Sequence, residues 1–217
     1  MNPTPDQDDS LVISYLTLRK TIGILGILLP FMVSLGAWLI FETGIQASIS
    51  AYYYTGTRNI FVGTLWAIGF FFFSYNGYDR RDEIAGGLAF TFALGASLFP
   101  TAPDCVSCTY SHAASNLHNV FAGFLFLTLS YFSLILFTQT DPSKTPTRQK
   151  LQRNVVYRVC GYTMLACIFL IIPLKVIPSL VMIAKEYDLV FWLEGITIVA
   201  FGLSWLTKGE AILSDES

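Results

Sequence analysis

The chain has 217 residues, of which 53% are hydrophobic, 15% aromatic and only 13% charged, and its net charge is −2. A soluble domain carries charge at roughly 25% of its positions, whereas the few charges here lie in short groups between apolar runs. Runs of about 20 apolar residues are long enough to cross a hydrocarbon core of roughly 30 Å as helices. The composition therefore excludes an ordinary soluble domain, and without a basic block the sequence predicts no nucleic-acid partner.

Six apolar segments are predicted to cross the membrane, so the predicted fold is an all-α polytopic bundle. An acidic, polar tail precedes them and lacks the basic start of a cleaved signal peptide, so we expect the first helix to be retained. Prolines inside the first and fifth segments predict kinks, because neighbouring helices in a membrane re-satisfy the interrupted backbone. The predicted tails are 1–17 and 208–217, and the predicted spans are 18–41, 60–78, 85–101, 117–138, 156–177 and 189–207.

The third predicted span carries small residues at steps of four: Ala85, Ala89, Ala93 and Ser97. Such a ladder lets another helix approach closely in a membrane. We therefore expect this helix to lie centrally. Small-residue helix faces serve packing between chains equally well, so a homo-oligomer is a second possibility.

The distribution of Lys and Arg predicts the orientation of the bundle. Cytoplasmic loops of membrane proteins carry an excess of these residues. Both termini are therefore predicted to be cytoplasmic, and the loops after the first and third spans are predicted to face outward. One side of the predicted spans holds Arg19, Lys20, Arg80, Arg81, Lys144, Arg148, Lys150, Arg153, Arg158 and Lys208, and the other holds Arg58, Lys175 and Lys185.

The first outward loop is rich in hydroxyl groups and aromatic rings. Tyrosine is favoured where a bilayer meets water, because its ring lies in the apolar region while its hydroxyl stays hydrated. The simplest interpretation is an aromatic belt with a turn. A more specific one is that aromatic rings and a cation hold a lipid headgroup. The candidate lipid-binding residues of this loop are Ser50, Tyr52, Tyr53, Tyr54 and Arg58, with Ser48 beside them.

Glu194 lies five residues inside the predicted sixth span, which is roughly 7 Å along a helix axis. An ionisable group at that depth is costly unless it faces the bundle, water or a partner, and it is a functional candidate by default. Arg58 or His118 is its expected counter-ion. A structural ion pair, or a carboxylate that reaches the headgroups, is an equally weighted interpretation.

His118 is predicted at the start of the fourth span. A single histidine there is most often a hydrogen-bonded structural residue, but its unperturbed pKa near neutrality also suits a general base or a metal ligand. The chain has only two histidines, so a site of three histidine ligands is excluded. No cofactor and no metal are predicted. His118 and Glu194 are the candidate catalytic residues, and both are also candidates for lining a lipid pocket.

Cys105 and Cys108 lie in the second outward loop, where an oxidising compartment favours a disulfide. Their spacing would also suit half of a zinc site, but a closed zinc site needs four ligands and only Asp104 and His112 lie nearby. The alternative to a structural disulfide is a redox-active pair, although such pairs usually open a helix in a thioredoxin-like fold or work with a second cysteine pair. The other two cysteines, Cys160 and Cys167, are predicted to be core residues.

Several of these segments resemble a known family. The stretch from Ile49 to Gly63, the end of the third span at 95–100, and His118 followed by Ala122-Gly123 resemble the Frag1/DRAM/Sfk1 superfamily of six-helix membrane proteins, closest to bacterial DUF998-type members. The resemblance implies cytoplasmic ends and lipid handling, since relatives are linked to GPI-anchor remodelling, phosphoinositide regulation and autophagy. At Ala51 eukaryotic relatives tend to have an acidic residue, so any role of that acid is in doubt here.

The sequence thus predicts a bacterial inner-membrane protein that binds a membrane lipid or similar amphiphile in an outward-facing polar pocket. One alternative is a lipid hydrolase or transferase with His118 and Glu194 as acid and base. Another is a thiol redox protein that uses Cys105 and Cys108. A scaffold that recruits partners through the polar loop 139–155 is a further alternative.

Overall fold

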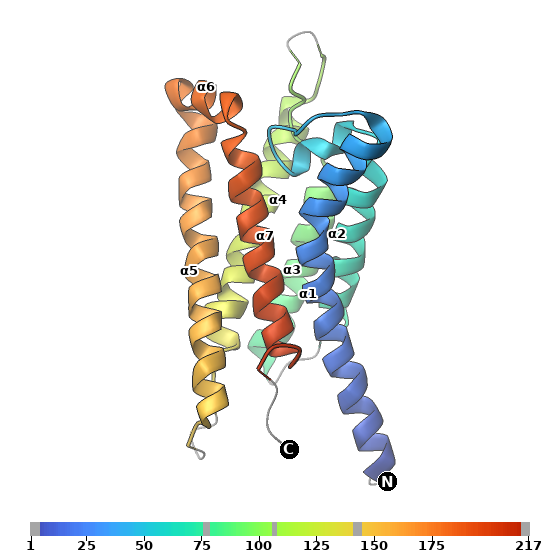
Figure 1. The fold of residues 1–217 in the computed structure, drawn as a ribbon, viewed down its shortest axis with the longest axis vertical. Helices are drawn as coiled ribbons and strands as arrows, with labels where there is room; N and C mark the ends of the chain where they lie inside the picture. Colours follow the sequence, from blue (N-terminus) through green and yellow to red (C-terminus); the bar gives the residue numbers. More distant parts are fainter. Residues whose placement is uncertain (1–4, 76–78, 106–107, 141–144, 214–217) are drawn as a thin grey trace.

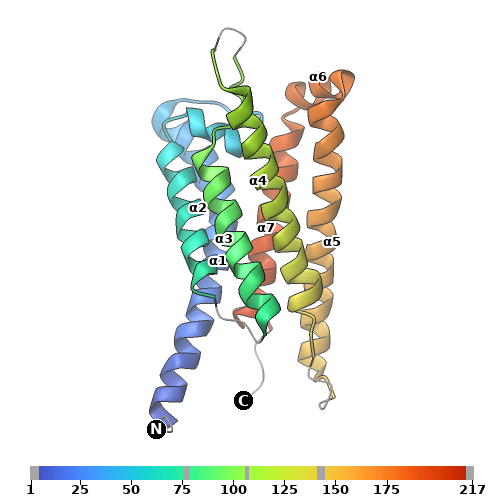
Figure 2. The ribbon, with the colours of Figure 1, turned by 180° about the vertical axis from the view of Figure 1, so that it is seen from behind.

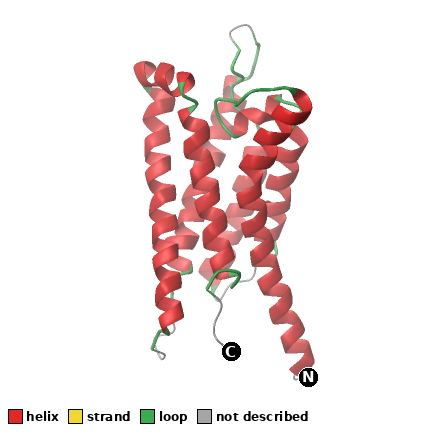
Figure 3. Ribbon diagram, in the orientation of Figure 1, coloured by secondary structure: helices red, strands yellow, loops and turns green. Residues whose placement is uncertain are grey.

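The computed structural model describes residues 5–75, 79–105, 108–140 and 145–213, and the side chains from 15 onward. These residues form seven α-helices and no strand (Figure 3). A short 3-10 helix, η1, follows α1, and a π-helical turn, η2, continues α4. The bounds are α1 Pro5–Phe41, η1 Ser50–Tyr54, α2 Arg58–Phe73, α3 Arg80–Leu98, α4 His112–Tyr131, η2 Phe132–Leu136, α5 Arg148–Val176, α6 Pro178–Glu186 and α7 Leu189–Lys208.

Six of the described helices run side by side and close into a ring (Figures 1 and 2). Going round it, α1 packs on α2, α2 on α3, α3 on α4, α4 on α5, α5 on α7 and α7 on α1. The short α6 connects α5 to α7. We call the end of the bundle that carries η1 and α6 the loop end, and the opposite end, where α1 begins and α7 ends, the terminal end.

Four described helices are long and apolar enough to cross a membrane, which makes this a membrane protein. They are α1 from Tyr15, α4 with η2, α5 and α7. The apolar helix α2 is shorter, at 16 residues. The first turn of α3 carries Asp82 and Glu83, so its apolar part is short as well. That all six ring helices span the membrane stays a prediction.

Several helix ends differ from the predicted ones, because capping groups lie outside the apolar runs. The predicted tail 1–17 is helical from Pro5, and a capping box at Asp79 begins α3. Thr147 caps α5, which begins at Arg148. Residues 148–155 of the predicted loop 139–155 therefore belong to this helix. The sequence analysis missed α6, whose start carries Pro178 at a position where proline is favoured.

The small-residue ladder on α3 is buried inside the chain. Ala89 and Ala93 are fully buried, and Ala85 and Ser97 are nearly so. On either side of this helix lie α2 and α4 (Figure 2). The expected close packing is therefore present within the monomer, but α3 is one of six members of the ring and not a central helix. A contact between copies needs another face.

Aromatic rings fill the terminal half of the bundle. Trp205 is 0% exposed and lies with its ring centroid 5.1 to 6.2 Å from five other rings. The π-helical turn brings Phe132 to this cluster, and beside it Ser133 donates a hydrogen bond to the Ser204 hydroxyl (2.9 Å). We call the six residues the aromatic cluster: Phe72, Tyr75, Phe132, Phe137, Phe201 and Trp205.

Candidate functional site

Glu194 fixes the loop before η1 onto α7. Its carboxylate is buried, at 7% exposure, and its Oε2 accepts a hydrogen bond from the Ile49 backbone N–H at 2.8 Å. Ile49 lies at the start of η1, where a helical N–H has no partner within the helix. The carboxylate supplies that partner. The sequence position of Glu194 predicted an inward-facing acid but not this backbone contact.

The counter-ion of Glu194 is Lys175, in the last turn of α5. Its Nζ lies 3.6 Å from Glu194 Oε1 and donates to Asn119 Oδ1 at 3.2 Å. The expectation of Arg58 or His118 in this role was wrong. Lys175 is 19 residues away from Glu194 in sequence, and the two meet because α5 and α7 are neighbours in the ring. No pattern within a single segment of the sequence predicts that these two helices are neighbours.

His118 caps the end of α3. It lies in the second turn of α4, because Ser111 caps this helix six residues earlier than the predicted start of the span. The ring is 2% exposed, and its Nδ1–H donates to the carbonyls of Ala96 (2.8 Å) and Phe99 (2.9 Å). Carbonyls at a helix end lack partners within the helix, so the histidine satisfies two of them. Of the two ring nitrogens, only Nε2 is then available to exchange a proton or to contact a ligand.

Three of the predicted residues line one cavity. Ser50, His118 and Glu194 lie around a space of about 60 Å³ inside the ring. The rest of its wall is apolar, and Phe72 and Phe201 of the aromatic cluster belong to it. We call this space the central cavity. It combines a polar margin with a hydrocarbon interior.

A larger polar recess lies at the loop end, between the loop before η1, α4, α5 and α6. It has a volume of about 250 Å³, and Ser48, Asn119 and Lys175 line it. Lys185 of α6 and Asp104 also belong to its wall, and their charged groups are 2.5 Å apart. We call this recess the vestibule. Since Lys175 lines the vestibule and Glu194 the central cavity, their ion pair marks the boundary between the two spaces.

The tyrosines and Arg58 do not join this site. Tyr52 is fully buried, and its hydroxyl accepts from the Gln46 N–H at 3.4 Å. Burial raises the pKa of Tyr52, so this hydroxyl stays protonated. Tyr54 donates to the Thr101 carbonyl at 2.7 Å, while Arg58 donates to the Tyr53 hydroxyl and stacks on that ring. None of the four lines the cavity or the vestibule.

Cys105 and Cys108 are joined in a disulfide, with their Cα atoms 5.5 Å apart. Cys160 and Cys167 are free thiols buried on α5. Within the described parts of the chain, no three His, Cys, Asp or Glu side chains gather closely enough to hold a metal ion. The half zinc site considered for Asp104 and His112 therefore has no complete ligand set among them.

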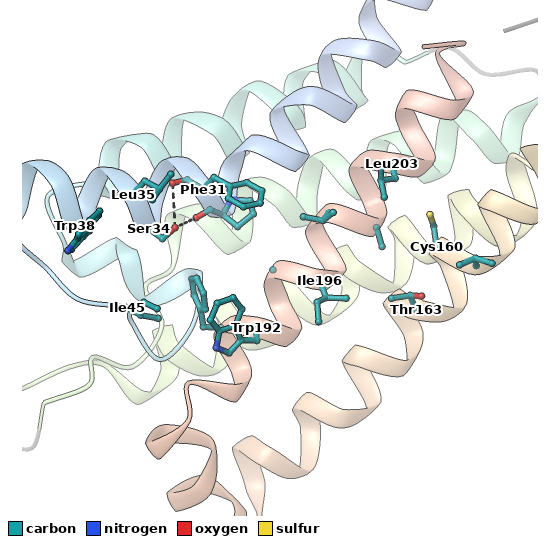
Figure 4. A pocket seen from close by; sticks show the side chains of 16 residues that line it. Phe31, Ser34, Leu35, Trp38, Ile45, Cys160, Thr163, Trp192, Ile196 and Leu203 are labelled. Atoms are coloured by element: carbon teal, nitrogen blue, oxygen red, sulfur yellow. Dashed lines mark hydrogen bonds between the residues drawn. The ribbon is translucent and has the colours of Figure 1, made fainter. Parts of the chain in front are cut away.

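A third recess, which the sequence analysis missed, is an apolar groove on the outside of the ring. Its volume is about 740 Å³, and α7 forms its floor between α1 and α5. Figure 4 shows Phe31 and Leu35 of α1 and Ile196 and Leu203 of α7 around this space. Individual exposed apolar residues are expected throughout a membrane protein, so only the packing of three helices reveals the groove.

Comparison of the chain with profiles of known protein families, with curated proteins and with solved structures finds no match. The resemblance to the Frag1/DRAM/Sfk1 superfamily therefore stays a prediction.

Proposed function

We propose that the protein spans the membrane six times, with both termini in the cytoplasm, and binds a lipid or similar amphiphile at its loop end. The observation that carries the proposal is the junction at the Glu194–Lys175 pair, where the polar vestibule adjoins the apolar central cavity. An amphiphile combines the same two chemistries. Its polar group would lie in the vestibule and its hydrocarbon end would point into the cavity.

The charges at this junction favour a functional role. Moving a carboxylate and an ammonium group out of water is costly, and removing one partner leaves the other charge buried. Ionisable groups within membrane helices are therefore rare, and they often mark binding sites or pathways. Lys175 is still about one-third exposed, so a ligand in the vestibule can reach it. An anionic or zwitterionic headgroup suits the two lysines of the vestibule wall.

The central cavity of about 60 Å³ is small for a lipid chain. A ligand pocket for a drug-sized molecule usually measures about 300–1,000 Å³. Binding thus requires the segment around Ile49 to move away from α7, and the Glu194 contacts hold that segment in place.

The test is lipid mass spectrometry on protein purified in mild detergent and incubated with a total bacterial lipid extract. Lys175→Met and Glu194→Gln should lose most of a lipid that the wild type retains. Arg58→Ala is the matched control, because Arg58 is at the same end but outside the vestibule and should retain the lipid. Equal lipid retention by all four well-folded proteins would overturn the proposal.

The enzyme alternative keeps one observation in its favour, since His118 and Glu194 line the same cavity. In that case Nε2 of His118 would exchange the proton, because Nδ1 is held by two carbonyls. The same lipid incubation tests it: a new lipid product formed by the wild type and lost in His118→Ala would establish an enzyme. Retained lipid without any product would favour binding alone.

A further inference from the structure

The apolar groove on the outside of the ring has the features of a site for a single lipid chain. Its floor is the outward face of α7, and α1 and α5 form its two walls (Figure 4). Only Ser34 and Thr163 contribute side-chain hydroxyls, and the Ser34 hydroxyl already donates to the Pro30 carbonyl at 2.6 Å. An occupant therefore meets almost nothing but hydrocarbon.

The length of the groove matches one leaflet of a bilayer. Along α7 it extends from Phe191 to Leu203, a distance of twelve residue steps, which corresponds to about 18 Å of helix. That is somewhat more than half of the roughly 30 Å hydrocarbon core, so the groove is long enough for a chain of one leaflet. Trp38 and Trp192 line its end nearest the loops, and both rings are more than half exposed. Tryptophan favours the level where chains meet headgroups, so this end fits the interface, and the groove extends from there past the middle of α7.

A hydrocarbon chain fits the groove better than a transmembrane helix does. Helices associate in membranes through small residues that let their backbones approach. The groove walls instead carry bulky side chains such as Phe31, Leu35 and Trp38. The close glycine contact of α7 is already used inside the chain, where a Cβ on Gly202 would lie 2.6 Å from the Gly23 carbonyl oxygen. Gly195 leaves its backbone open in the groove floor, but a second helix would have to pass the bulky side chains of the walls to approach it.

We propose that this groove binds an acyl chain of a membrane lipid from the leaflet at the loop end. The inference deepens the proposed function and rests on its assignment of a membrane-spanning bundle, but it does not need the vestibule to be occupied. Val190 lines the vestibule and Trp192 the groove, so the two recesses lie on different faces of the start of α7. Each site can therefore be blocked without the other.

Gly195 allows the groove to be filled without disturbing the fold. A Cβ at this position meets no atom within 4 Å, and the residue lies in the groove. Gly195→Phe should therefore occupy the space meant for the chain. Gly63→Phe is the matched control, because Gly63 is a glycine on α2 with equally open space and lies outside the groove.

The experiment places the proteins in vesicles of phosphatidylethanolamine and phosphatidylglycerol that contain a small fraction of phosphatidylcholine with a diazirine on one acyl chain. After illumination, mass spectrometry maps the labelled residues. The wild type should be labelled several-fold more at groove residues than on the outer face of α2. Gly195→Phe should lose this enrichment, and Gly63→Phe should keep it. Val199→Phe, one turn further along the groove floor, replaces Gly195→Phe if that variant fails to fold.

Equal labelling of all outward-facing helix surfaces would overturn the acyl-chain site, because it would indicate contact with the surrounding bilayer alone. Crosslinks between two copies at the groove would also overturn it in favour of a dimer contact. Lys175→Met separates the two proposals: it should reduce lipid retention in the vestibule and leave groove labelling unchanged. If the wild type shows no groove enrichment but still retains lipid, or if Gly195→Phe keeps the enrichment, the groove site alone is rejected.

Discussion

The two halves of α7 show how one helix serves two purposes. In the loop half, Glu194 faces the central cavity and Gly195 faces the open groove. In the terminal half, Trp205 is surrounded by rings and Gly202 lies against the backbone of α1. The polar recesses are thus found in the loop half, and the groove continues along the outer face to Leu203, while the core of the terminal half is filled by rings. Dense packing in one half can hold the bundle together while the other half keeps its recesses.

Charged groups also differ between the two ends. At the loop end the buried pair Glu194–Lys175 borders a recess. At the terminal end Arg19 is 5% exposed, stacks on Tyr15 and donates to the Lys208 carbonyl, and Asp82 is 2% exposed. The Arg19 guanidinium also lies 5.7 Å from the ring centroid of Tyr75, which belongs to the aromatic cluster. Substitutions should therefore affect stability most in the terminal half and ligand binding most in the loop half.

The largest effect is expected from Trp205→Ala. Removing this fully buried ring leaves a cavity among five aromatic neighbours, so the free energy of unfolding should fall by about 3–5 kcal/mol. Thermal unfolding in detergent should show this loss of stability as a lower Tm. Trp192→Ala is the control, since this tryptophan is 54% exposed and should change Tm little. Equal losses would show that the two halves do not differ in packing.

A smaller loss is expected from Gly202→Ala. The new methyl group would lie 2.6 Å from the Gly23 carbonyl oxygen and 2.9 Å from the Ile27 nitrogen, so α1 and α7 must separate. Overpacking of this kind costs about 1–3 kcal/mol. Gly195→Ala on the same helix meets nothing and should leave Tm unchanged or slightly raised. A tolerated Gly202→Ala would mean that the α1–α7 contact is looser than the structure shows.

Lys175→Met tests the ion pair of the loop half. It leaves Glu194 without its cation, but Lys175 is about one-third exposed, so the loss of stability should be only about 1 kcal/mol. Adding Glu194→Gln should recover most of the lost stability, because it removes the unpaired charge and its amide oxygen can still accept the hydrogen bond from the Ile49 N–H. A double-mutant cycle from Tm values gives the coupling. Additive losses in the double variant would contradict a direct ion pair.

The smallest effect is expected from Arg58→Ala. Arg58 is exposed, and its contact with the Tyr53 ring at 4.0 Å is worth about 0.5 kcal/mol at such a site. Tm should change by less than in Lys175→Met, and lipid retention should stay at the wild-type level. A clear loss of bound lipid would return Arg58 to the binding site that the sequence predicted for it.

Much of the fold follows from local patterns. Apolar runs predict the helices of the ring within a few residues at most ends, and the start of α7 at Leu189 was predicted as found. Ends set by capping groups were missed, as at Asp79 and Thr147, because polar residues before an apolar run look like part of a loop. The helix α6 was missed for another reason, because at nine residues it is too short to be recognised as a membrane span.

The site was predictable only in part. Ser50, His118 and Glu194 were selected for being polar near apolar segments, and they do line one cavity. The same criterion selected Arg58 and the tyrosines, which bond to each other and to loop carbonyls instead. Lys175 was not selected as the partner of Glu194, since a lysine near the end of a predicted span is expected to reach the headgroups.

The sequence by itself determined that this chain is helical and belongs in a membrane, because both properties depend on composition and spacing within single segments. Only the tertiary structure decided which helices are neighbours, and that choice created the Glu194–Lys175 pair, the central cavity and the groove. The physical reason is that contacts between helices depend on side-chain shape across segments far apart in the chain. Local hydropathy carries no information about those shapes.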